Sequence, residues 1–344
     1  ITSDKDSLGI ISRQSNNGDL TNATVPHLSD SLKNYPRFTV WKIHERTGER
    51  YSTLPDTLLY NYQQSTLPDG HSIAMGHLGN LGSPVLSKVY FDRGESSQFF
   101  FYDSYYLYNK NPNNQLFFNT RIPYARVNYQ RSGGNIDKEE RMETRFTMNF
   151  NRHLNVGFDL DFINAKGFYA SQAVKQNNYS AYANYLSDRF EVHAYGSQTS
   201  VTNFENGGIS DSIFITNPES IEENFSSRDI PTRMKDTWNI LKTNQFYLSA
   251  RYNLGYNKEV ADDAEKEFVP VASLIFTSKF KEQYRRFLSY DTTNVVRPNM
   301  SNAHAIDTLY NNRYYKSAVD DSTRYSSFKN TIALSMREGF RDWL

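Results

Sequence analysis

The sequence predicts an all-β protein, an antiparallel transmembrane β-barrel whose strands follow one another up and down. Three observations predict this fold: side chains that alternate between apolar and polar, connections that alternate between short and long, and an unusual composition. The chain has 344 residues with 25 tyrosines and 23 phenylalanines, yet its mean hydropathy is −0.70. A polar average with many aromatic residues is typical of strands that have one wet face and one apolar face.

The composition excludes several classes of protein. Since 38 basic residues balance 38 acidic ones, no basic field indicates binding to nucleic acid. No stretch approaches the roughly 18 consecutive apolar residues that a membrane-spanning helix needs. The absence of cysteine excludes disulfides, zinc–thiolate sites and thiol catalysis. We expect neither a cofactor nor a bound metal.

The first 95 residues differ from the rest of the chain. Residues 1–35 are rich in Ser, Asn and Asp without a pattern, which predicts a flexible arm. Residues 36–95 are predicted to lie on the periplasmic side or in the barrel lumen, with a hairpin at 37–60 and a Gly-rich stretch at 76–84 that packs tightly against the barrel. The start at Ile1 is expected to follow a removed signal peptide or to mark the boundary of a fragment.

Residues 96–344 are predicted to form the barrel strands, with a two-residue period from about residue 97. In the clearest segment, Met142, Phe146 and Met148 share one parity while charged residues occupy the other. Successive side chains of a strand point to opposite faces, so this alternation indicates one apolar and one polar face. The pattern predicts eight strands, at 121–130, 140–150, 154–162, 178–186, 190–197, 245–254, 268–280 and 328–337.

The connections between these strands alternate in length. The turns at 151–153 and 187–188 are short, whereas long links at 201–243 and 281–326 leave the opposite ends of the strands. Short periplasmic turns and longer external loops are typical of outer-membrane barrels. A soluble β-sandwich is the alternative, but its strands average about 5–6 residues and connect across two sheets.

The chain is expected to be only the N-terminal part of a larger barrel. Loops of this length, together with a last segment at 339–344 that resembles a turn, suggest further strands.

The polar parity is predicted to line a water-filled lumen. Charges on it would either bias ion passage or pair with one another across the wall. Asp159 and Asp161 share a face, as the two carboxyl groups of a glycosidase must, but lumen solvation explains them better. The predicted lumen-lining residues are Arg141, Glu143, Arg145, Asp159, Asp161, Glu191 and Arg251.

No catalytic residue is assigned, and the sequence predicts that the protein is not an enzyme. His71 and His77, near Asp69, lie six residues apart, a spacing that fits no common metal site. His153 and His193 are the candidates for a hydrolase or protease site, but neither has a convincing Ser or Asp partner.

Six segments stand out in order over roughly residues 50–260. They are Asp56–Tyr60, Leu78–Pro84 with Val89–Phe91, Asn119–Tyr124, Asn155–Asp159, Asn164–Tyr169 and Asn206–Ile209. These segments resemble the putative porin family of Bacteroidota, an outer-membrane β-barrel family. The resemblance implies a signal-directed barrel longer than this chain, with a pore function and no catalytic residues.

Two functions follow as hypotheses. The first is a porin-like barrel in the outer membrane of a Gram-negative bacterium, which allows passive diffusion of small solutes through a polar lumen. The alternative is a structural or accessory subunit of a larger secretion or assembly complex, for which the long loops would supply binding area. The expected contacts are outer-membrane lipid and, in the second case, other outer-membrane proteins or lipoproteins; the oligomeric state does not follow from the sequence.

Overall fold

The computed structural model describes residues 38–54, 67–68, 73–134, 137–221, 226–259, 266–289 and 319–336. The chain divides into two compact units, residues 1–36 and 37–344. The predicted flexible arm, His71 with Asp69, and the end of the chain at 337–344 lie outside the described residues. No described helix is long and apolar enough to cross a membrane.

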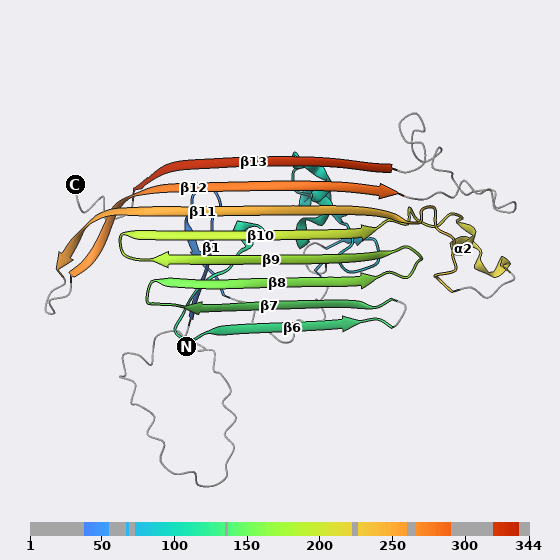
Figure 1. The fold of residues 1–344 in the computed structure, drawn as a ribbon, viewed down its shortest axis with the longest axis horizontal. Helices are drawn as coiled ribbons and strands as arrows, with labels where there is room; N and C mark the ends of the chain where they lie inside the picture. The colour runs from blue at the N-terminus through green and yellow to red at the C-terminus, as the bar shows by residue number, and fades with distance from the viewer. Residues whose placement is uncertain are drawn as a thin grey trace, which may run out of the picture. The chain divides into compact units, whose positions relative to one another are not determined.

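Eight strands form one antiparallel sheet, and each strand pairs with the next one along the chain (Figure 1). This confirms the all-β class and the up-and-down meander. Within the described residues, β6 and β13 are the two edges and do not pair with each other, so closure into a barrel stays a prediction. The strands are β6 (Tyr124–Ser132), β7 (Glu139–Asn149), β8 (Leu154–Lys166), β9 (Ala173–Leu186), β10 (Phe190–Phe204), β11 (Thr237–Glu259), β12 (Lys266–Ser289) and β13 (Val319–Met336).

Several strands extend beyond their predicted ends. β11, β12 and β13 contain 23, 24 and 18 residues. The connection from β10 to β11 is therefore 205–236 rather than 201–243, and it contains α2 (Ile213–Thr216) and η5 (Pro218–Ser220). The extensions were missed because the alternation that marks a strand weakens there. Ser322–Arg324 of β13 is polar on both faces, and in β11 Lys242 and Asn244 interrupt the apolar parity between Ile240 and Phe246.

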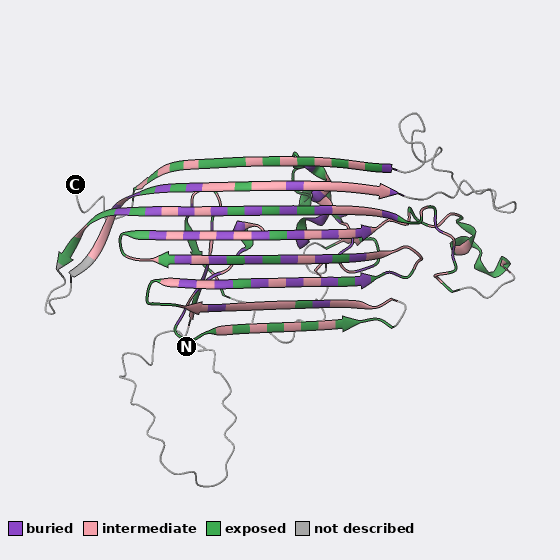
Figure 2. Cartoon of the chain, viewed as in Figure 1, coloured by how far each residue is buried: buried purple, intermediate pink, exposed green. Residues whose placement is uncertain are grey.

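The apolar residues that alternate along each strand all point to one face of the sheet, called the outer face below. These side chains are exposed although they are large: Phe246 is 53 %, Phe328 66 % and Ile332 75 % exposed. They occur on all eight strands and are called the belt below, and Figure 2 shows exposed positions alternating with buried ones along several of these strands. The belt includes Val127, Tyr129, Met142, Phe158, Tyr179, Tyr185, Phe190, Phe246, Tyr252, Leu254, Leu274, Phe276, Phe280, Phe328, Ile332, Leu334 and Met336.

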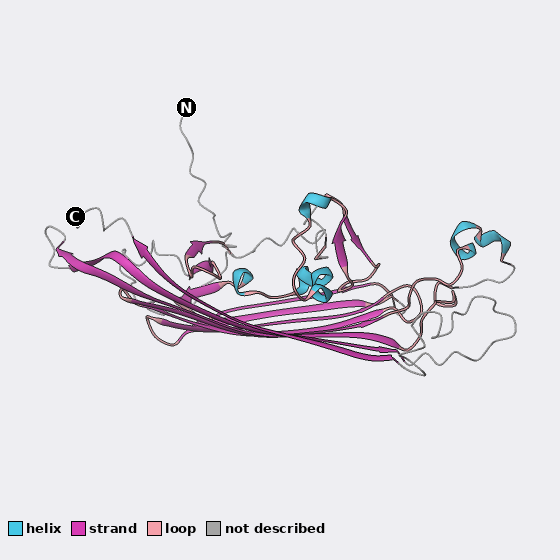
Figure 3. Ribbon diagram, turned by 90° about the horizontal axis from the view of Figure 1, so that it is seen from above, coloured by secondary structure: helices cyan, strands magenta, loops and turns pink. Residues whose placement is uncertain are grey.

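The inner face is covered by an inner layer built from residues 38–54 and 73–120, which lies on one side of the sheet in Figure 3. One part is a three-stranded sheet in the order β2-β1-β5. The other is a β3–β4 hairpin with three 3-10 segments. The elements are β1 (Phe38–Ile43), β2 (Arg50–Ser52), β3 (Met75–His77), β4 (Val85–Ser87), η2 (Tyr90–Asp92), η3 (Phe100–Tyr108), η4 (Pro112–Asn114) and β5 (Phe117–Thr120).

The inner layer extends further along the chain than its sequence indicates. A two-residue period was expected from about residue 97, but Phe100–Tyr108 forms two short 3-10 helices joined by a kink at Tyr105, and that expectation is wrong for this segment. Tyr102, Tyr105 and Tyr108 are its buried residues, at intervals of three, the 3-10 repeat. Their burial, rather than alternation along a strand, explains the aromatic run.

Two apolar clusters join the inner layer to the sheet. Near the long-loop ends of the strands, Tyr105 and Tyr108 pack with Ile163, Val201 and Leu241. Near the short-turn ends, Trp41 and Phe117 pack with Tyr182, Tyr195 and Tyr247. The inner layer is therefore attached to the eight-stranded sheet, called the wall below, at two separate places.

The Gly-rich stretch allows a close approach in the first of these clusters. Gly82 has φ +80°, and a Cβ atom there would lie 2.9 Å from Cγ1 of Val174 and 3.4 Å from Cγ2 of Ile163. This agrees with the prediction that the glycines let the backbone pack tightly against the strands.

Candidate functional site

All seven predicted lumen residues lie on the inner face, where β7, β8, β10 and β11 place them. Their exposure follows the two-residue period, since each faces the inner layer while its sequence neighbours face outward. Arg141, Asp159, Asp161, Glu191 and Arg251 are buried, whereas Glu143 and Arg145 are half-buried.

The first charge network is centred on Arg141. Its guanidinium donates two hydrogen bonds to Asp161, from Nε at 3.1 Å and from Nη2 at 3.0 Å, and one to Glu143 at 2.6 Å. Lys110 of the inner layer approaches Asp161 at 3.6 Å. Bidentate arginine–carboxylate pairs are strong and geometrically specific, so they fix these side chains on the wall.

The second network lies further along the same strands, with its arginine four residues from Arg141 on β7 and its aspartate two residues from Asp161 on β8. Arg145 donates from Nε to Asp159 at 2.6 Å, and Gln115 of the inner layer donates to the other oxygen of Asp159 at 3.0 Å. The interpretation that these charges pair across the wall is thus confirmed. Each network also contains one contact from the inner layer, an ion pair from Lys110 in the first and a hydrogen bond from Gln115 in the second, and these contacts join the layer to the sheet.

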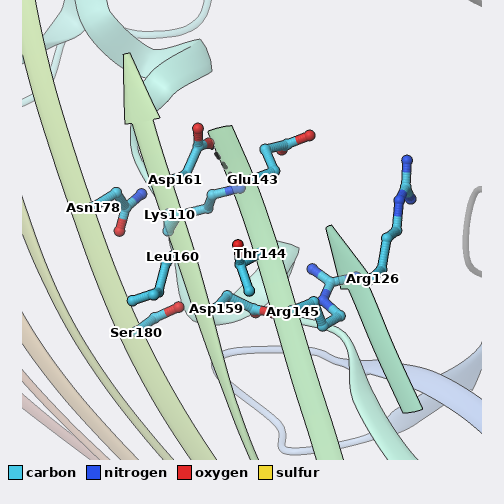
Figure 4. Close-up of a pocket in the computed structure, with 10 residues that line it drawn as sticks. All are labelled: Lys110, Arg126, Glu143, Thr144, Arg145, Asp159, Leu160, Asp161, Asn178 and Ser180. Carbon is cyan, nitrogen blue, oxygen red and sulfur yellow. Dashed lines mark hydrogen bonds and ion pairs between the residues drawn. The ribbon is translucent and has the colours of Figure 1, made fainter. Parts of the chain in front are cut away.

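A small cavity of about 50 Å³ lies between the two networks (Figure 4). It is lined by Lys110, Arg126, Glu143, Thr144, Arg145, Asp159, Leu160, Asp161, Asn178 and Ser180. Four acidic residues (Glu139, Glu143, Asp159 and Asp161) offset four basic ones (Lys110, Arg126, Arg141 and Arg145) on this part of the face. The region is therefore electrically neutral and closely filled.

A larger cavity lies nearer the short-turn ends of the strands. Its volume is about 620 Å³, and it lies between the β1–β2 hairpin and the strands β10, β11 and β13. Arg50 of the hairpin binds Glu191 with two contacts, at 3.2 and 3.3 Å, and also lies over the ring of Trp41 at 5.7 Å. Arg251 is directly opposite Glu191 in the strand register. The cavity therefore has both signs of charge on its lining.

The two histidines that were candidates for a hydrolase site, His193 and His153, both make contacts with other parts of the chain. His193 is buried, accepts a hydrogen bond from Trp41 Nε1 at 3.0 Å and packs edge-on to Phe117 at 5.0 Å. His153 is exposed, with Nδ1 2.6 Å from the carbonyl oxygen of Leu186. In the part of the chain that is described, no group of three His, Cys, Asp or Glu side chains is arranged to hold a metal.

Sequence reasoning missed Lys110, Gln115 and Arg50, which complete the networks from the inner layer. No periodic signal marks their positions, because they lie in irregular or short segments. One signal was available in the sequence: the charged residues predicted on the inner parity of the strands. A charge that is buried in a folded protein needs a partner, so these residues implied polar partners elsewhere in the chain.

A comparison with families of proteins found one match. The family described as Putative porin covers residues 37–344, so the chain belongs to this family. A comparison with curated proteins found no match, and neither did a comparison with solved structures. Membership in a porin family points to a channel rather than an enzyme.

Proposed function

We propose that this chain forms part of the wall of a porin-like β-barrel in a bacterial outer membrane, through which small hydrophilic solutes diffuse passively. The observation that carries the proposal is the inverted burial of the sheet. Polar and charged side chains are covered, while large apolar side chains are exposed over eight strands. Water would penalise such a surface, but lipid hydrocarbon is its natural solvent.

The height of the belt supports a membrane location. On β12 the outward apolar positions run from Ala272 to Phe280, about 27 Å along the strand. This is close to the apolar band of roughly 25 Å that outer-membrane barrels present to lipid. Beyond the belt, the outward positions become charged, as in the pairs of Arg324 with Glu282 and Arg286 with Asp320. The extensions of β10–β13 would then stand outside the membrane on the long-loop side.

The inner layer supports a wall of more than eight strands. A closed barrel of eight strands has room inside for little more than its own side chains. Here the inner face is covered by a small sheet, a hairpin and three 3-10 segments. In addition, the free edges of β6 and β13 would leave backbone groups without partners in lipid. We therefore place the inner layer, residues 38–54 and 73–120, in the lumen of a larger barrel, where it narrows the solute path.

The experiment is a conductance measurement on the full-length protein, purified in detergent and inserted into a planar lipid bilayer. The proposal expects discrete conductance steps that grow in proportion to salt concentration. A preparation that retains its β-sheet circular dichroism and its resistance to protease, yet never conducts, would contradict passive diffusion. Outer-membrane location is tested separately by membrane fractionation of the source bacterium.

The alternative function is an accessory subunit of an outer-membrane secretion or assembly complex. The strand extensions and the 205–236 connection with its short α2 and η5 segments favour it, since they offer surface beyond the belt. Copurification in a mild detergent distinguishes the two functions. A porin should be recovered alone or with copies of itself, whereas a subunit should bring the same other proteins in fixed proportion.

A further inference from the structure

The two ends of the inner face differ in charge. The region around β7 and β8 is neutral, as described above. On β12 and β13, at the other edge of the sheet in Figure 1, four cations lie on the inner parity: Lys279, Lys281, Arg285 and Lys329. This group is called the basic strip below.

Two members of the basic strip have carboxylate partners. Lys279 contacts Glu45 of the inner layer at 2.6 Å. Arg285 lies 3.6 Å from Asp321, and its guanidinium also stacks over the ring of Phe101 at 4.3 Å. These two cations are thus neutralised and held in place.

The other two members have no ion-pair partner among the described residues. Lys281 and Lys329 make no ion pair or hydrogen bond with any residue that the structure describes. Glu45 and Asp103 act on Lys281 electrostatically without pairing with it; Glu45 contacts Lys279, and the oxygens of Asp103 accept hydrogen bonds from Ser96 and Ser97. In the described part of the chain, four cations therefore face three carboxylates, and the ammonium groups of Lys281 and Lys329 have no ion-pair partner there.

The strand register brings these charges together. Lys279 is directly opposite Lys329, and Lys281 is opposite Ser327, two residue pairs further along and on the same face. Like charges directly opposite on neighbouring strands destabilise a sheet. An anion between the ammonium groups would offset this repulsion, and a row of lysines facing a pore is a known means of favouring anions.

We propose that Lys281 and Lys329, supported by Lys279, form an anion-binding station on the lumen face and make the pore selective for small anionic solutes. This inference rests on the proposed function and adds the solute class to it. Chloride and solutes that carry carboxylate or phosphate groups share the required chemistry, which is a compact negative charge.

The test is the reversal potential of the full-length protein in a planar bilayer that separates two concentrations of KCl. The wild type should prefer chloride over potassium. The variant with both Lys281→Gln and Lys329→Gln should lose at least about fourfold in the chloride-to-potassium permeability ratio, since even one unit charge at about 5 Å in water changes the local concentration of chloride alone by that factor. Inorganic phosphate should reduce the chloride current of the wild type more strongly than that of the variant.

Two controls separate charge from structure. Lys242→Gln removes the same charge from the outer parity of β11 and should leave the selectivity unchanged. The variant with both Lys281→Arg and Lys329→Arg keeps the charges and should keep the selectivity. If the double glutamine variant does not fold, the single change Lys329→Gln at the exposed edge serves in its place.

The outcomes are distinguishable. Conductance with a selectivity that the glutamine variant does not change overturns this inference and leaves the porin function standing. A wild type that prefers potassium also overturns it. A bilayer that stays silent with folded protein overturns both proposals.

Discussion

At the scale of single residues, the inner face depends on charges that are buried in pairs. Arg141 and Asp161 are 7 % and 4 % exposed, and each is the other's main partner. Removing one member of a buried pair leaves an uncompensated charge, whereas replacing both with neutral polar side chains is far less costly. The two networks therefore specify the position of the inner layer on the wall, and their net contribution to the free energy of unfolding is small.

This predicts the effect of substitutions in the first network. Arg141→Gln should destabilise the protein by about 3 kcal/mol, and adding Asp161→Asn should restore most of that loss. Urea unfolding of the protein in phospholipid vesicles provides the measurement. Arg324→Gln, in an exposed outer pair, should cost less than about 1 kcal/mol. A double variant as unstable as the single one would show that the pair itself stabilises the fold.

A second residue-scale prediction concerns two strand glycines. A Cβ atom at Gly157 would lie 2.4 Å from the ring of Tyr182, whereas at Gly196 the nearest atom is 3.9 Å away. Gly157→Ala should therefore displace Tyr182 from Phe117 and cost about 1–3 kcal/mol. Gly196→Ala should be tolerated. Equal unfolding midpoints for the two variants would mean that Tyr182 does not lie across Gly157.

At the scale of elements, the strands could be predicted, but the inner layer only in part: the hairpin within 37–60 and the close packing of the Gly-rich stretch were predicted, and the rest was not. All eight strands follow from the alternation of apolar and polar side chains, because outward-facing and covered positions differ most within the belt. Outside it the contrast fades, and the ends of β11–β13 were missed. Residues 100–108 carry no strand period, since their burial follows a 3-10 repeat. The partners of the wall charges in the layer, Lys110 and Gln115, depend on tertiary contacts alone.

The tyrosines of η3 give the inner layer a dependence on alkaline pH. Burial raises the pKa of Tyr102 and Tyr108 to about 12. Because unfolded tyrosine ionises near pH 10, the stabilisation is fully present below pH 10 and is lost as the pH rises to about 12. Each tyrosine should contribute a loss on the order of 2 kcal/mol over this range. We expect the layer to detach while the strands persist.

Near-ultraviolet circular dichroism against pH tests this expectation. A variant with Tyr102→Phe and Tyr108→Phe should keep its aromatic signal to higher pH than the wild type. Tyr90→Phe, at a position that is 73 % exposed, should behave as the wild type does. If all three proteins lose the signal at the same pH, ionisation of the buried tyrosines does not control the layer.

At the scale of the whole molecule, the proposed function places the two faces of one sheet in different environments. The outer face with its belt contacts lipid, and the inner face contacts the inner layer inside the barrel. A charge placed at the middle of the belt should therefore be costly. Ile332→Arg is expected to destabilise the protein by about 2–4 kcal/mol, whereas Ser326→Arg, outward but beyond the belt, should cost no more than about 1 kcal/mol. Vesicle unfolding titrations compare the two. Equal and small effects would place both positions in water.

The most direct test of the central claim uses the absence of native cysteine. Single cysteines are introduced at each position from 328 to 336 on β13, labelled with a fluorophore, and quenched by brominated lipid in vesicles. The account predicts a two-residue period, with strong quenching at positions 328, 332, 334 and 336 and weak quenching at 329, 331, 333 and 335. Quenching without a period, or strongest at the odd positions, would contradict a lipid-facing apolar belt.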